Sequence, residues 1–328
     1  MPPIRHMVIS GGGHSLFKIL GICETLHRHG FWKHEDLVSI YGTSAGAMIS
    51  IVLAMKFDWP VLYDYIITRP WKDAFKFDFH TFLEVYTTRG LFDKKKIAIM
   101  FKPLFDAKDI PLDISLRSFY EWSGIDLHFF TTEFNTLALE EISYTTHPDL
   151  PLLTALHMTC AVPVLFTPVF HEGRCYLDGG MISNYPLEYC IQRYAPTVED
   201  QASILGFKNK YIDEDINETK HKAIPEDSNL VDFLLQALHK LVFHLSNENT
   251  QPSLENEIPI HKKTMSPAQM QAVVLSMDAR KELYDDGVAF ATQWWQEKQN
   301  TYEDNKGSVG PTVLSKNTVN SGTCGLAS

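Results

Sequence analysis

The sequence lacks most features that mark disulfide-rich or membrane-spanning proteins. Its 328 residues include five cysteines, an odd number, and none of them stands in a C-x-x-C pattern. Scattered cysteines of this kind predict free thiols in a reducing compartment, not a disulfide framework. No run of about 18 apolar residues, the length that crosses a bilayer, is present. The N-terminus shows no charged region followed by an apolar core, so no signal peptide is expected. These absences predict a cytoplasmic protein.

Basic residues are the minority among the charged ones. Lysine and arginine number 29 and aspartate and glutamate 40, which gives a net charge of -11. A nucleic-acid-binding domain is normally basic, so this composition argues against nucleic acid as a partner. It also argues against strong attraction of the whole chain to anionic membranes, although a local basic patch is compatible with it. The length and the 45% hydrophobic content fit one large globular α/β domain or two small ones.

The first 55 residues alternate between short apolar runs and helical stretches. Residues 6–10 have the pattern of a buried strand, and a helix is predicted from about 14 to 29, with Gly30 as its C-cap. A second strand is predicted over 37–41, followed by a helix that ends near Met55. Strand–helix alternation predicts a parallel sheet with helices on its faces. We therefore expect a three-layer α/β/α fold with a largely parallel central sheet.

The chain between residues 57 and 124 is less regular and rich in aromatic residues. Their spacing predicts a helical insert close to the functional site. Aromatic residues at helical spacing usually belong to a packed core. The same insert is compatible with a lid or an acyl-binding wall, and the two roles do not exclude each other.

The C-terminal part of the chain completes the domain. Residues 247–265 are polar and read as a surface insertion, 271–277 as a sheet strand, and 279–296 as a closing helix. Beyond about residue 299 the composition is rich in Gly, Ser, Thr and Asn, which predicts a disordered tail. We therefore assign residues 1–298 to one domain and 299–328 to the tail.

A candidate nucleophile follows the second predicted strand. The sequence Gly42-Thr43-Ser44-Ala45-Gly46 fits G-x-S-x-G between a strand and a helix, the pattern of a nucleophile elbow. Side chains two positions before and after the serine would collide in so tight a turn, and glycine at 42 and 46 removes them. Ser44 is then exposed at the positive end of the following helix. The plainer alternative is a strand–helix turn built from small residues for close packing.

Two further glycine motifs supply candidate partners for a serine nucleophile. Gly11-Gly12-Gly13 follows the first strand, where consecutive backbone N–H groups at a helix N-terminus suit an oxyanion. Asp178 precedes Gly179 and Gly180 after a predicted strand, so its carboxylate is a candidate base. An Asp-Gly-Gly sequence alone is most often just a turn. If strands 1 and 2 are adjacent in a parallel sheet, the glycine loop and Ser44 share the edge where α/β sites form.

These motifs make the sequence resemble the patatin-like phospholipase family. The resemblance covers roughly residues 6–207 and rests on motifs in this order: Ser10-Gly11-Gly12-Gly13, Gly42-Thr43-Ser44-Ala45-Gly46, Cys160-Ala161-Val162-Pro163-Val164-Leu165-Phe166, Asp178-Gly179-Gly180 and Asn184-Tyr185-Pro186-Leu187.

The resemblance implies a lipid acyl hydrolase with a Ser–Asp dyad. Ser44 would be the nucleophile and Asp178 the base, and backbone N–H groups of the loop from Gly11 to His14, above all those of Gly12 and Gly13, would hold the oxyanion. It implies hydrolysis of phospholipid or acylglycerol esters through an acyl-enzyme, without metal or cofactor. The partner would be lipid at a membrane or micelle surface. The sequence does not indicate a protein activator.

The sequence departs from the family in its glycine-rich loop. That loop commonly reads G-x-G-x-[K/R]-G, whereas Ser15 and Leu16 stand at the last two positions here. Lys18 is the nearest cation. The glycines that would hold the oxyanion are intact, so the departure concerns the shape of the loop and any contact of its basic residue with a substrate phosphate.

The residues leave three alternative interpretations of the chain open. A Ser–Asp–His triad would draw its histidine from His221, His239, His244 or His261, although Ser44 comes early in the chain for that fold. A dinucleotide-binding loop would need a third glycine where Leu16 stands. A non-enzymatic binding or scaffold relative is the third, because fold does not fix function. An aspartate base works poorly when fully solvated, so the dyad predicts a partly desolvated Asp178.

Overall fold

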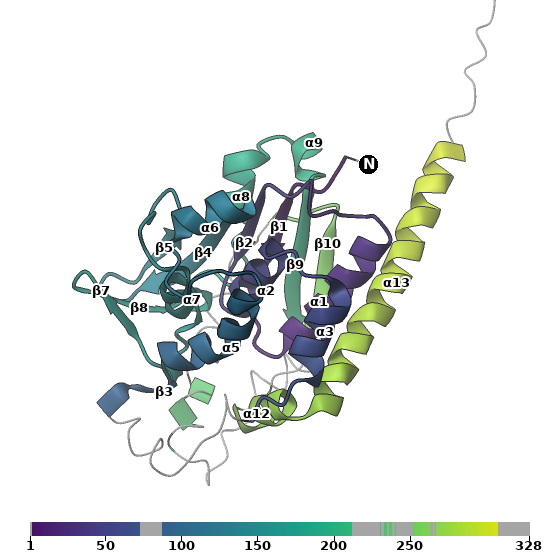
Figure 1. Ribbon diagram of the computed structural model, residues 1–328. Coiled ribbons are helices and arrows are strands. Elements are labelled where there is room, and N and C mark those ends of the chain that lie inside the picture. The colour runs from purple at the N-terminus through teal and green to yellow at the C-terminus, as the bar shows by residue number, and fades with distance from the viewer. Residues whose placement is uncertain are drawn as a thin grey trace, which may run out of the picture.

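The computed structural model describes residues 2–72, 87–211, 252–262, 265 and 267–307, together with isolated positions between 230 and 240. These residues form a three-layer α/β/α domain around one eight-stranded sheet (Figure 1). In spatial order the strands are β10 (Glu257–Lys262), β9 (Ile204–Tyr211), β1 (His6–Ile9), β2 (Ser39–Gly42), β4 (Asp126–Glu133), β8 (Arg174–Asp178) and β7 (Val169–His171), and β5 (Ala138–Ile142) pairs with β4. The strands from β10 to β4 are parallel, whereas β5, β8 and β7 are antiparallel to their neighbours. The predicted largely parallel α/β/α fold is confirmed.

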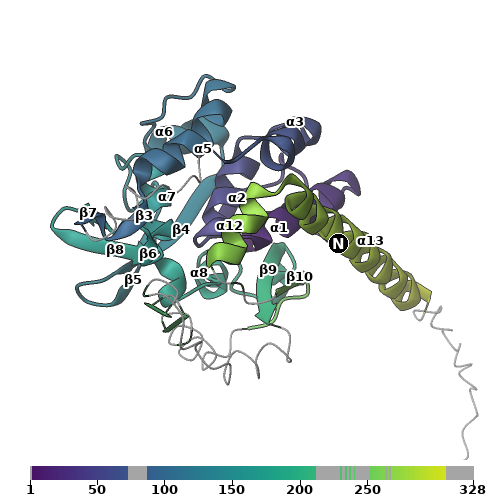
Figure 2. The ribbon, with the colours of Figure 1, turned by 90° about the horizontal axis from the view of Figure 1, so that it is seen from below.

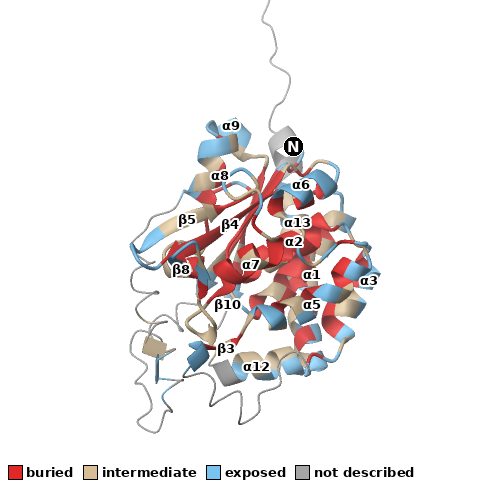
Figure 3. Cartoon of the chain, turned by 60° about the vertical axis from the view of Figure 1, so that its left-hand side comes forward, coloured by how far each residue is buried: buried red, intermediate tan, exposed pale blue. Residues whose placement is uncertain are grey.

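Helices cover both faces of this sheet. The described helices are α1 (Ser15–Arg28), α2 (Ala45–Ala54), α3 (Trp59–Tyr63), the π-helix η1 (Asp64–Thr68), α5 (Lys94–Asp106), α6 (Leu116–Ser123), α7 (Leu152–Cys160), the 3-10 helix η2 (Gly179–Met181), α8 (Leu187–Tyr194), α9 (Val198–Gln201), α12 (Pro267–Leu275) and α13 (Met277–Gly307). Successive strand residues point to opposite faces. Met7 and Ile9 therefore belong to the apolar cluster of α1, α2 and α7, while Val8 belongs to that of α8. Central strands such as β4 lie buried between these layers, whereas β5 is partly exposed (Figure 3).

The helical insert contributes aromatic residues to the core and also contains a strand. In its described part, α3, η1, α5 and α6 hold buried aromatic residues, among them Trp59, Phe105 and Phe119. This supports the packed-core interpretation. The insert also contains β3 (Gly90–Phe92), which pairs in parallel with β6 (Val164–Phe166) beyond the edge of the main sheet. Residues 73–86 of the predicted insert lie outside the described residues.

Helix α13 closes the domain by lying along α1 (Figures 1 and 2). A Cβ atom at Gly21 would stand 2.2 Å from the carbonyl oxygen of Tyr284, and one at Gly287 would stand 2.1 Å from that of Lys18. The two glycines therefore let the helix backbones approach more closely than any side chain would allow.

The end of α13 differs from the predicted domain boundary. The helix continues through Gly307, past residue 299 where the tail was expected to begin, and residues 308–328 lie outside the described part of the chain. Charged residues recur along α13. Over the residues that the structure describes, no helix combines the length and the apolar content needed to cross a membrane.

Two predictions for the C-terminal part were wrong. The stretch 271–277 is not a strand, because α12 extends from Pro267 to Leu275. The edge position in the sheet is taken by β10, which lies inside the predicted polar insertion 247–265. Ile258 and Ile260 of β10 are fully buried and alternate with the less buried Glu257, Pro259 and His261. Pro259 fits because an edge strand leaves one side without a ladder partner.

A buried arginine joins α12 to η1. Arg280 is 1% exposed and donates to the carbonyl oxygens of Ile67 (2.6 and 3.1 Å), Arg69 (2.9 Å) and Val274. These carbonyls lie at the C-terminal ends of η1 and α12, where the helix dipole favours a cation. A single guanidinium therefore satisfies two helix ends at once.

We expect Arg280→Met to lower the free energy of unfolding by about 2–4 kcal/mol, because one buried and two partly buried carbonyls lose a charged donor. Urea denaturation followed by circular dichroism measures this. Arg28→Met is the matched control: Arg28 is exposed on α1 and pairs with Glu24, so its loss should change stability by less than about 1 kcal/mol. Equal effects of the two substitutions would contradict a stabilising role for the hydrogen bonds of Arg280.

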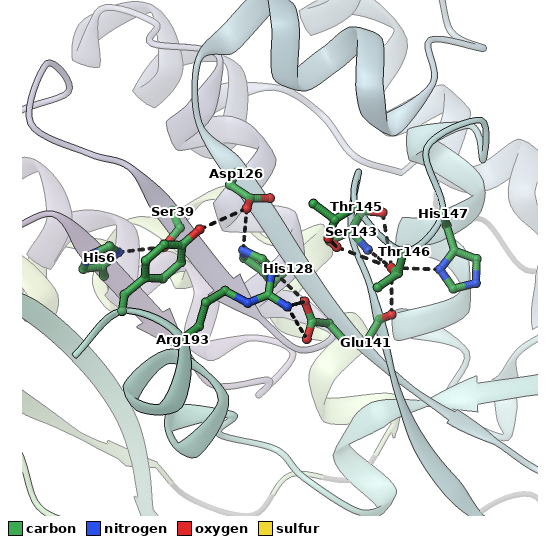
Figure 4. Close-up of polar contacts among 11 residues, drawn as sticks. His6, Ser39, Asp126, His128, Glu141, Ser143, Thr145, Thr146, His147 and Arg193 are labelled. Atoms are coloured by element: carbon green, nitrogen blue, oxygen red, sulfur yellow. Dashed lines mark hydrogen bonds and ion pairs between the residues drawn. The ribbon is translucent and has the colours of Figure 1, made fainter. Parts of the chain in front are cut away.

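A buried polar network occupies the amino ends of the strands, opposite the edge where β1 and β2 run into their loops (Figure 4). His128 is fully buried, with Nε2 2.9 Å from Asp126 and Nδ1 2.7 Å from Glu141. Arg193 lies 3.1 Å from Glu141, and the ring of Tyr41 stacks on that of His128 with centroids 4.1 Å apart. Burial alone would lower the pKa of His128, but the two carboxylates outweigh it and raise that pKa above its ordinary value. The two carboxylates therefore favour the protonated imidazole over the neutral one.

Candidate active site

Strand register brings the candidate nucleophile and base to the same level. Gly42, the last residue of β2, pairs with Phe129 of β4, and Ser44 follows in the turn at the carboxyl end of β2. Thr131 pairs with Asp178 on the other side of β4. Ser44 and Asp178 therefore meet across the carboxyl end of β4. β8 runs antiparallel to β4, from Tyr176 opposite Glu133 to Asp178 opposite Thr131, so the base is the last residue of its own strand.

Ser44 has the strained backbone of an elbow. Its φ is 54° and its ψ is -121°, a conformation that costs a residue with a side chain on the order of 1–3 kcal/mol. A Cβ atom at Gly46 would stand 2.2 Å from the carbonyl oxygen of Ile9, and one at Gly42 would stand 2.6 Å from the Ser50 hydroxyl. The spacing of the two glycines thus has the steric reason inferred from the motif.

Asp178 is enclosed at the end of β8. It is 4% exposed, and its Oδ1 accepts the Gly180 N–H at 2.7 Å. Burial raises the pKa of Asp178 to about 6, while the Ser44 hydroxyl and the Gly180 N–H act in the opposite direction. Oδ2 is buried without a hydrogen bond of ordinary geometry in the described part of the chain. The desolvated aspartate that a dyad requires is present, with one oxygen left to take a proton.

The glycine loop lies directly beside the serine. A Cβ atom at Gly11 would stand 3.0 Å from the Ser44 Cβ. The N–H groups of Ser15 and Leu16 turn back onto the loop, to the carbonyls of Gly12 and Gly13. Among the described residues, no backbone carbonyl accepts from the N–H of Gly12 or Gly13. These two groups are thus available to a developing oxyanion, while His14 precedes the first residue of α1 and is buried.

Two asparagine side chains, one from a distant loop and one from β9, hold the glycine loop in place. Asn184 donates to the Gly11 carbonyl at 2.9 Å and accepts the Gly11 N–H on its own carbonyl at 3.1 Å. Asn209, at the end of β9, donates to the same Gly11 carbonyl. Because C=O and N–H of one peptide point in opposite directions, fixing the Gly11 carbonyl fixes the direction of the Gly12 N–H. Asn184 belongs to a recognised motif, but no sequence signal marked Asn209.

Ser15, which stands where the family's loop has a basic residue, and the nearby Lys18 have other roles here. The Ser15 hydroxyl donates to the Gly12 carbonyl at 3.3 Å, so it helps to close the first turn of α1. Lys18, the nearest cation in the sequence, pairs with Asp286 of α13 at 2.6 Å. It therefore serves the contact between α1 and α13 and does not replace the loop's basic residue.

The thiol of Cys160, close to Ser44 and Asp178, is a poor candidate for a second nucleophile. Burial, and then the charge of Asp178, raise the pKa of the Cys160 thiol well above its ordinary value, so it stays protonated. Among the described residues, no group of three or more His, Cys, Asp or Glu side chains is arranged to hold a metal ion. Ser44 is the nucleophile that the geometry favours.

The histidines proposed for a triad do not meet Asp178 in the described part of the chain. His261 lies on β10, at the far edge of the sheet, with β9 and β1 between it and β2. His221, His239 and His244 lie outside the described residues. In that part of the chain, the groups that contact the Asp178 carboxylate are Gly180 and Ser44.

A three-layer α/β/α fold with a strained serine at a strand–helix turn defines the class of this chain. The chain belongs to the patatin-like phospholipase family, whose family model matches residues 7–191. The earlier resemblance is thereby confirmed.

Curated relatives and solved structures give more distant similarities. The chain is 23% identical over 194 residues to "Probable lipid hydrolase 463L" of Invertebrate iridescent virus 6, covering 57% of this chain and 63% of that protein. It is 22% identical over 188 residues to an uncharacterised protein of Acanthamoeba polyphaga mimivirus, covering 56% and 60%. The chain thus spans about three fifths of these relatives. The structure of VipD from Legionella pneumophila has a TM-score of 0.45 at 16% identity, covering 87% of this chain and 67% of VipD.

Proposed function

We propose that this chain hydrolyses carboxylic esters of lipids, phospholipids or acylglycerols, through a covalent acyl-enzyme on Ser44. The observation that carries the proposal is the meeting of three groups at one sheet edge. Strained Ser44 lies beside the glycine loop, where no backbone carbonyl of the described residues accepts from the N–H of Gly12 or Gly13, and the buried carboxylate of Asp178 faces Ser44 across β4. Membership of the patatin-like phospholipase family supports the same chemistry.

Each step of the reaction has a group to perform it. Asp178 takes the Ser44 hydroxyl proton as the oxygen attacks the ester carbonyl, and the N–H groups of Gly12 and Gly13 stabilise the oxyanion. The tetrahedral intermediate collapses, and the leaving alcohol takes the proton from Asp178. Water then attacks the acyl-enzyme, gives a proton to Asp178, and releases a fatty acid as Ser44 recovers its proton.

Fatty acid release from lipid vesicles or micelles tests this proposal. Phosphatidylcholine, lysophosphatidylcholine and triacylglycerol emulsions are offered to the full chain, and free fatty acid is measured by mass spectrometry. Release from at least one of them supports lipid ester hydrolysis. No release from any, by a well-folded chain that also fails to react with a fluorophosphonate, would favour a lipid-binding or scaffold relative.

The pH dependence of hydrolysis should show a limb near pH 6. The pKa of Asp178 is raised by burial to about 6, and only the ionised carboxylate accepts the serine proton. The value of kcat/KM should therefore fall about tenfold for each unit below that pH. Initial rates between pH 4 and 9, on a chain shown to stay folded throughout, measure this.

The position of the limb alone does not separate a dyad from a triad, because an ordinary histidine pKa is about 6.5. Temperature does: a carboxylic acid ionises with almost no enthalpy change, whereas an imidazole loses its proton more readily on warming. We expect the limb to stay in place between 10 and 35 °C, two temperatures chosen for the assay. A limb that moves to lower pH on warming would contradict Asp178 as the base.

A further inference from the structure

The backbone of the nucleophile is held by a side chain from another helix. The Ser44 N–H donates to the Thr159 Oγ1 at 3.0 Å. Thr159 is fully buried and belongs to the last turn of α7. Neither α2 nor β2 supplies the acceptor for this N–H, so the elbow depends on a contact that is remote in sequence.

The direction of this hydrogen bond is fixed by a second one. The Thr159 hydroxyl lies 2.5 Å from the carbonyl oxygen of Phe130 on β4. A carbonyl only accepts, so the hydroxyl proton must point to Phe130 and a lone pair of Oγ1 faces Ser44. Thr159 therefore links the Ser44 N–H to β4 through a relay of two hydrogen bonds, and its hydroxyl group has a single orientation that satisfies both.

The same segment of β4 holds the base. The Thr131 hydroxyl donates to the Leu177 carbonyl at 2.7 Å, and the Thr132 hydroxyl donates to the Asp178 carbonyl at 3.0 Å. The segment 130–132 of β4 is thus connected to both groups. Phe130 is linked to Ser44 through Thr159, and Thr132 bonds directly to Asp178. A shift at Thr159 changes the separation of nucleophile and base.

We propose that Thr159 is a positioning residue for the reaction. Its hydroxyl holds Ser44 in the strained conformation and fixes the distance from Ser44 to Asp178. The proposal rests on the proposed function, because a positioning role needs a reaction to position. Strained residues persist only where their surroundings over-determine them, and this relay supplies that constraint.

The relay also assigns the oxyanion donors. In chymotrypsin-like proteases the nucleophile's own N–H helps to bind the oxyanion. Here the Ser44 N–H is committed to Thr159, so it is unavailable for that role. Stabilisation of the oxyanion therefore depends on the glycine loop. The Ser44 N–H holds the elbow, whereas the N–H groups of Gly12 and Gly13 serve the oxyanion.

Paired substitutions of Thr159 test the proposal. Thr159→Val keeps the shape of the side chain and removes the hydroxyl, whereas Thr159→Ser keeps the hydroxyl. We expect kcat to fall on the order of 10–100-fold in Thr159→Val, since small misplacements of reacting groups have effects of this size. KM should change less than about twofold and Thr159→Ser should recover most of kcat.

Thr25→Val is the matched control for losing a buried hydroxyl. The Thr25 hydroxyl donates to the Gly21 carbonyl at 2.8 Å inside α1, away from the site. Rates are compared per folded molecule, and thermal unfolding is recorded for each variant. If Thr159→Val loses thermal stability as Thr25→Val does but keeps kcat within about twofold of wild type, the role is structural only and the proposal is overturned.

A second readout separates this proposal from the proposed function. Amide hydrogen exchange at Ser44, resolved by NMR or by overlapping peptides, should be protected in wild type and in Thr159→Ser. It should be faster in Thr159→Val. If wild type neither hydrolyses lipid nor reacts with a fluorophosphonate, the proposed function fails and positioning of a reaction fails with it. Unchanged exchange at Ser44 in Thr159→Val of an active chain overturns the relay alone.

Discussion

Ser44→Ala should abolish both covalent labelling by a fluorophosphonate and fatty acid release. The substitution removes the attacking oxygen and leaves the glycine loop and Asp178 in place. Removal of a serine nucleophile lowers kcat by several powers of ten in other serine hydrolases, so we expect a loss of at least about 10⁴-fold. Labelling of wild type and variant side by side, with the adduct located by mass spectrometry, measures the effect directly.

The fold should survive this change. Ser44 has a strained backbone, and alanine keeps the same Cβ, so the elbow gains no new clash. Ser50→Ala is the matched control, because Ser50 lies on α2 close to the elbow and donates to the Gly46 carbonyl at 2.8 Å. It should keep its labelling. An adduct on another residue in wild type, or hydrolysis that continues in Ser44→Ala, would remove Ser44 from the mechanism.

The sequence was most informative where a local rule fixes the backbone. The elbow needs glycine at 42 and 46 for steric reasons, and the structure shows the backbone atoms that a Cβ would strike. Likewise, Gly11–Gly13 follow a strand in a loop where, among the described residues, no backbone carbonyl accepts from the N–H of Gly12 or Gly13, as consecutive glycines suggested. Such features depend on a few adjacent residues, so one sequence is enough to find them.

Tertiary contacts were beyond the reach of local rules. Thr159 and Asn209 touch Ser44 and Gly11 from elements more than a hundred residues away, and nothing in their own neighbourhoods marks them. Short apolar runs are also ambiguous between strand and buried helix. The run at 271–277 is part of α12, while the alternating isoleucines of β10 offered a strand signal that its polar surroundings hid.

The polar network at the far end of the sheet shows how a local sequence can conceal a strong interaction. Asp126 and His128 stand two apart on β4 and face the same side, but Glu141 and Arg193 come from β5 and α8. A histidine with a carboxylate on each ring nitrogen is a strong candidate for stability, not for catalysis, because it is fully buried at the edge away from Ser44.

We expect His128→Ala to lower the free energy of unfolding by about 3–5 kcal/mol, because it leaves the buried carboxylate of Asp126 and the partly buried carboxylate of Glu141 without their shared cation. Urea denaturation at pH 7 measures the loss. His171→Ala is the matched control: His171 lies 3.8 Å from an exposed Glu172, and its removal should have an effect below about 1 kcal/mol.

The contribution of His128 should also depend on pH in a defined direction. Its folded pKa is raised above the ordinary value of about 6.5, so its stabilisation is complete below that pH and is lost as pH rises through the folded pKa. The pKa of Glu141 is lowered, since the contacts with His128 and Arg193 outweigh its burial, so its share is lost as the medium becomes acidic. The stability difference between wild type and His128→Ala should therefore be greatest in mildly acidic solution, below about pH 6.5, and shrink as the solution becomes alkaline. A difference that grows steadily with pH would mean that the buried imidazole is neutral in the folded chain.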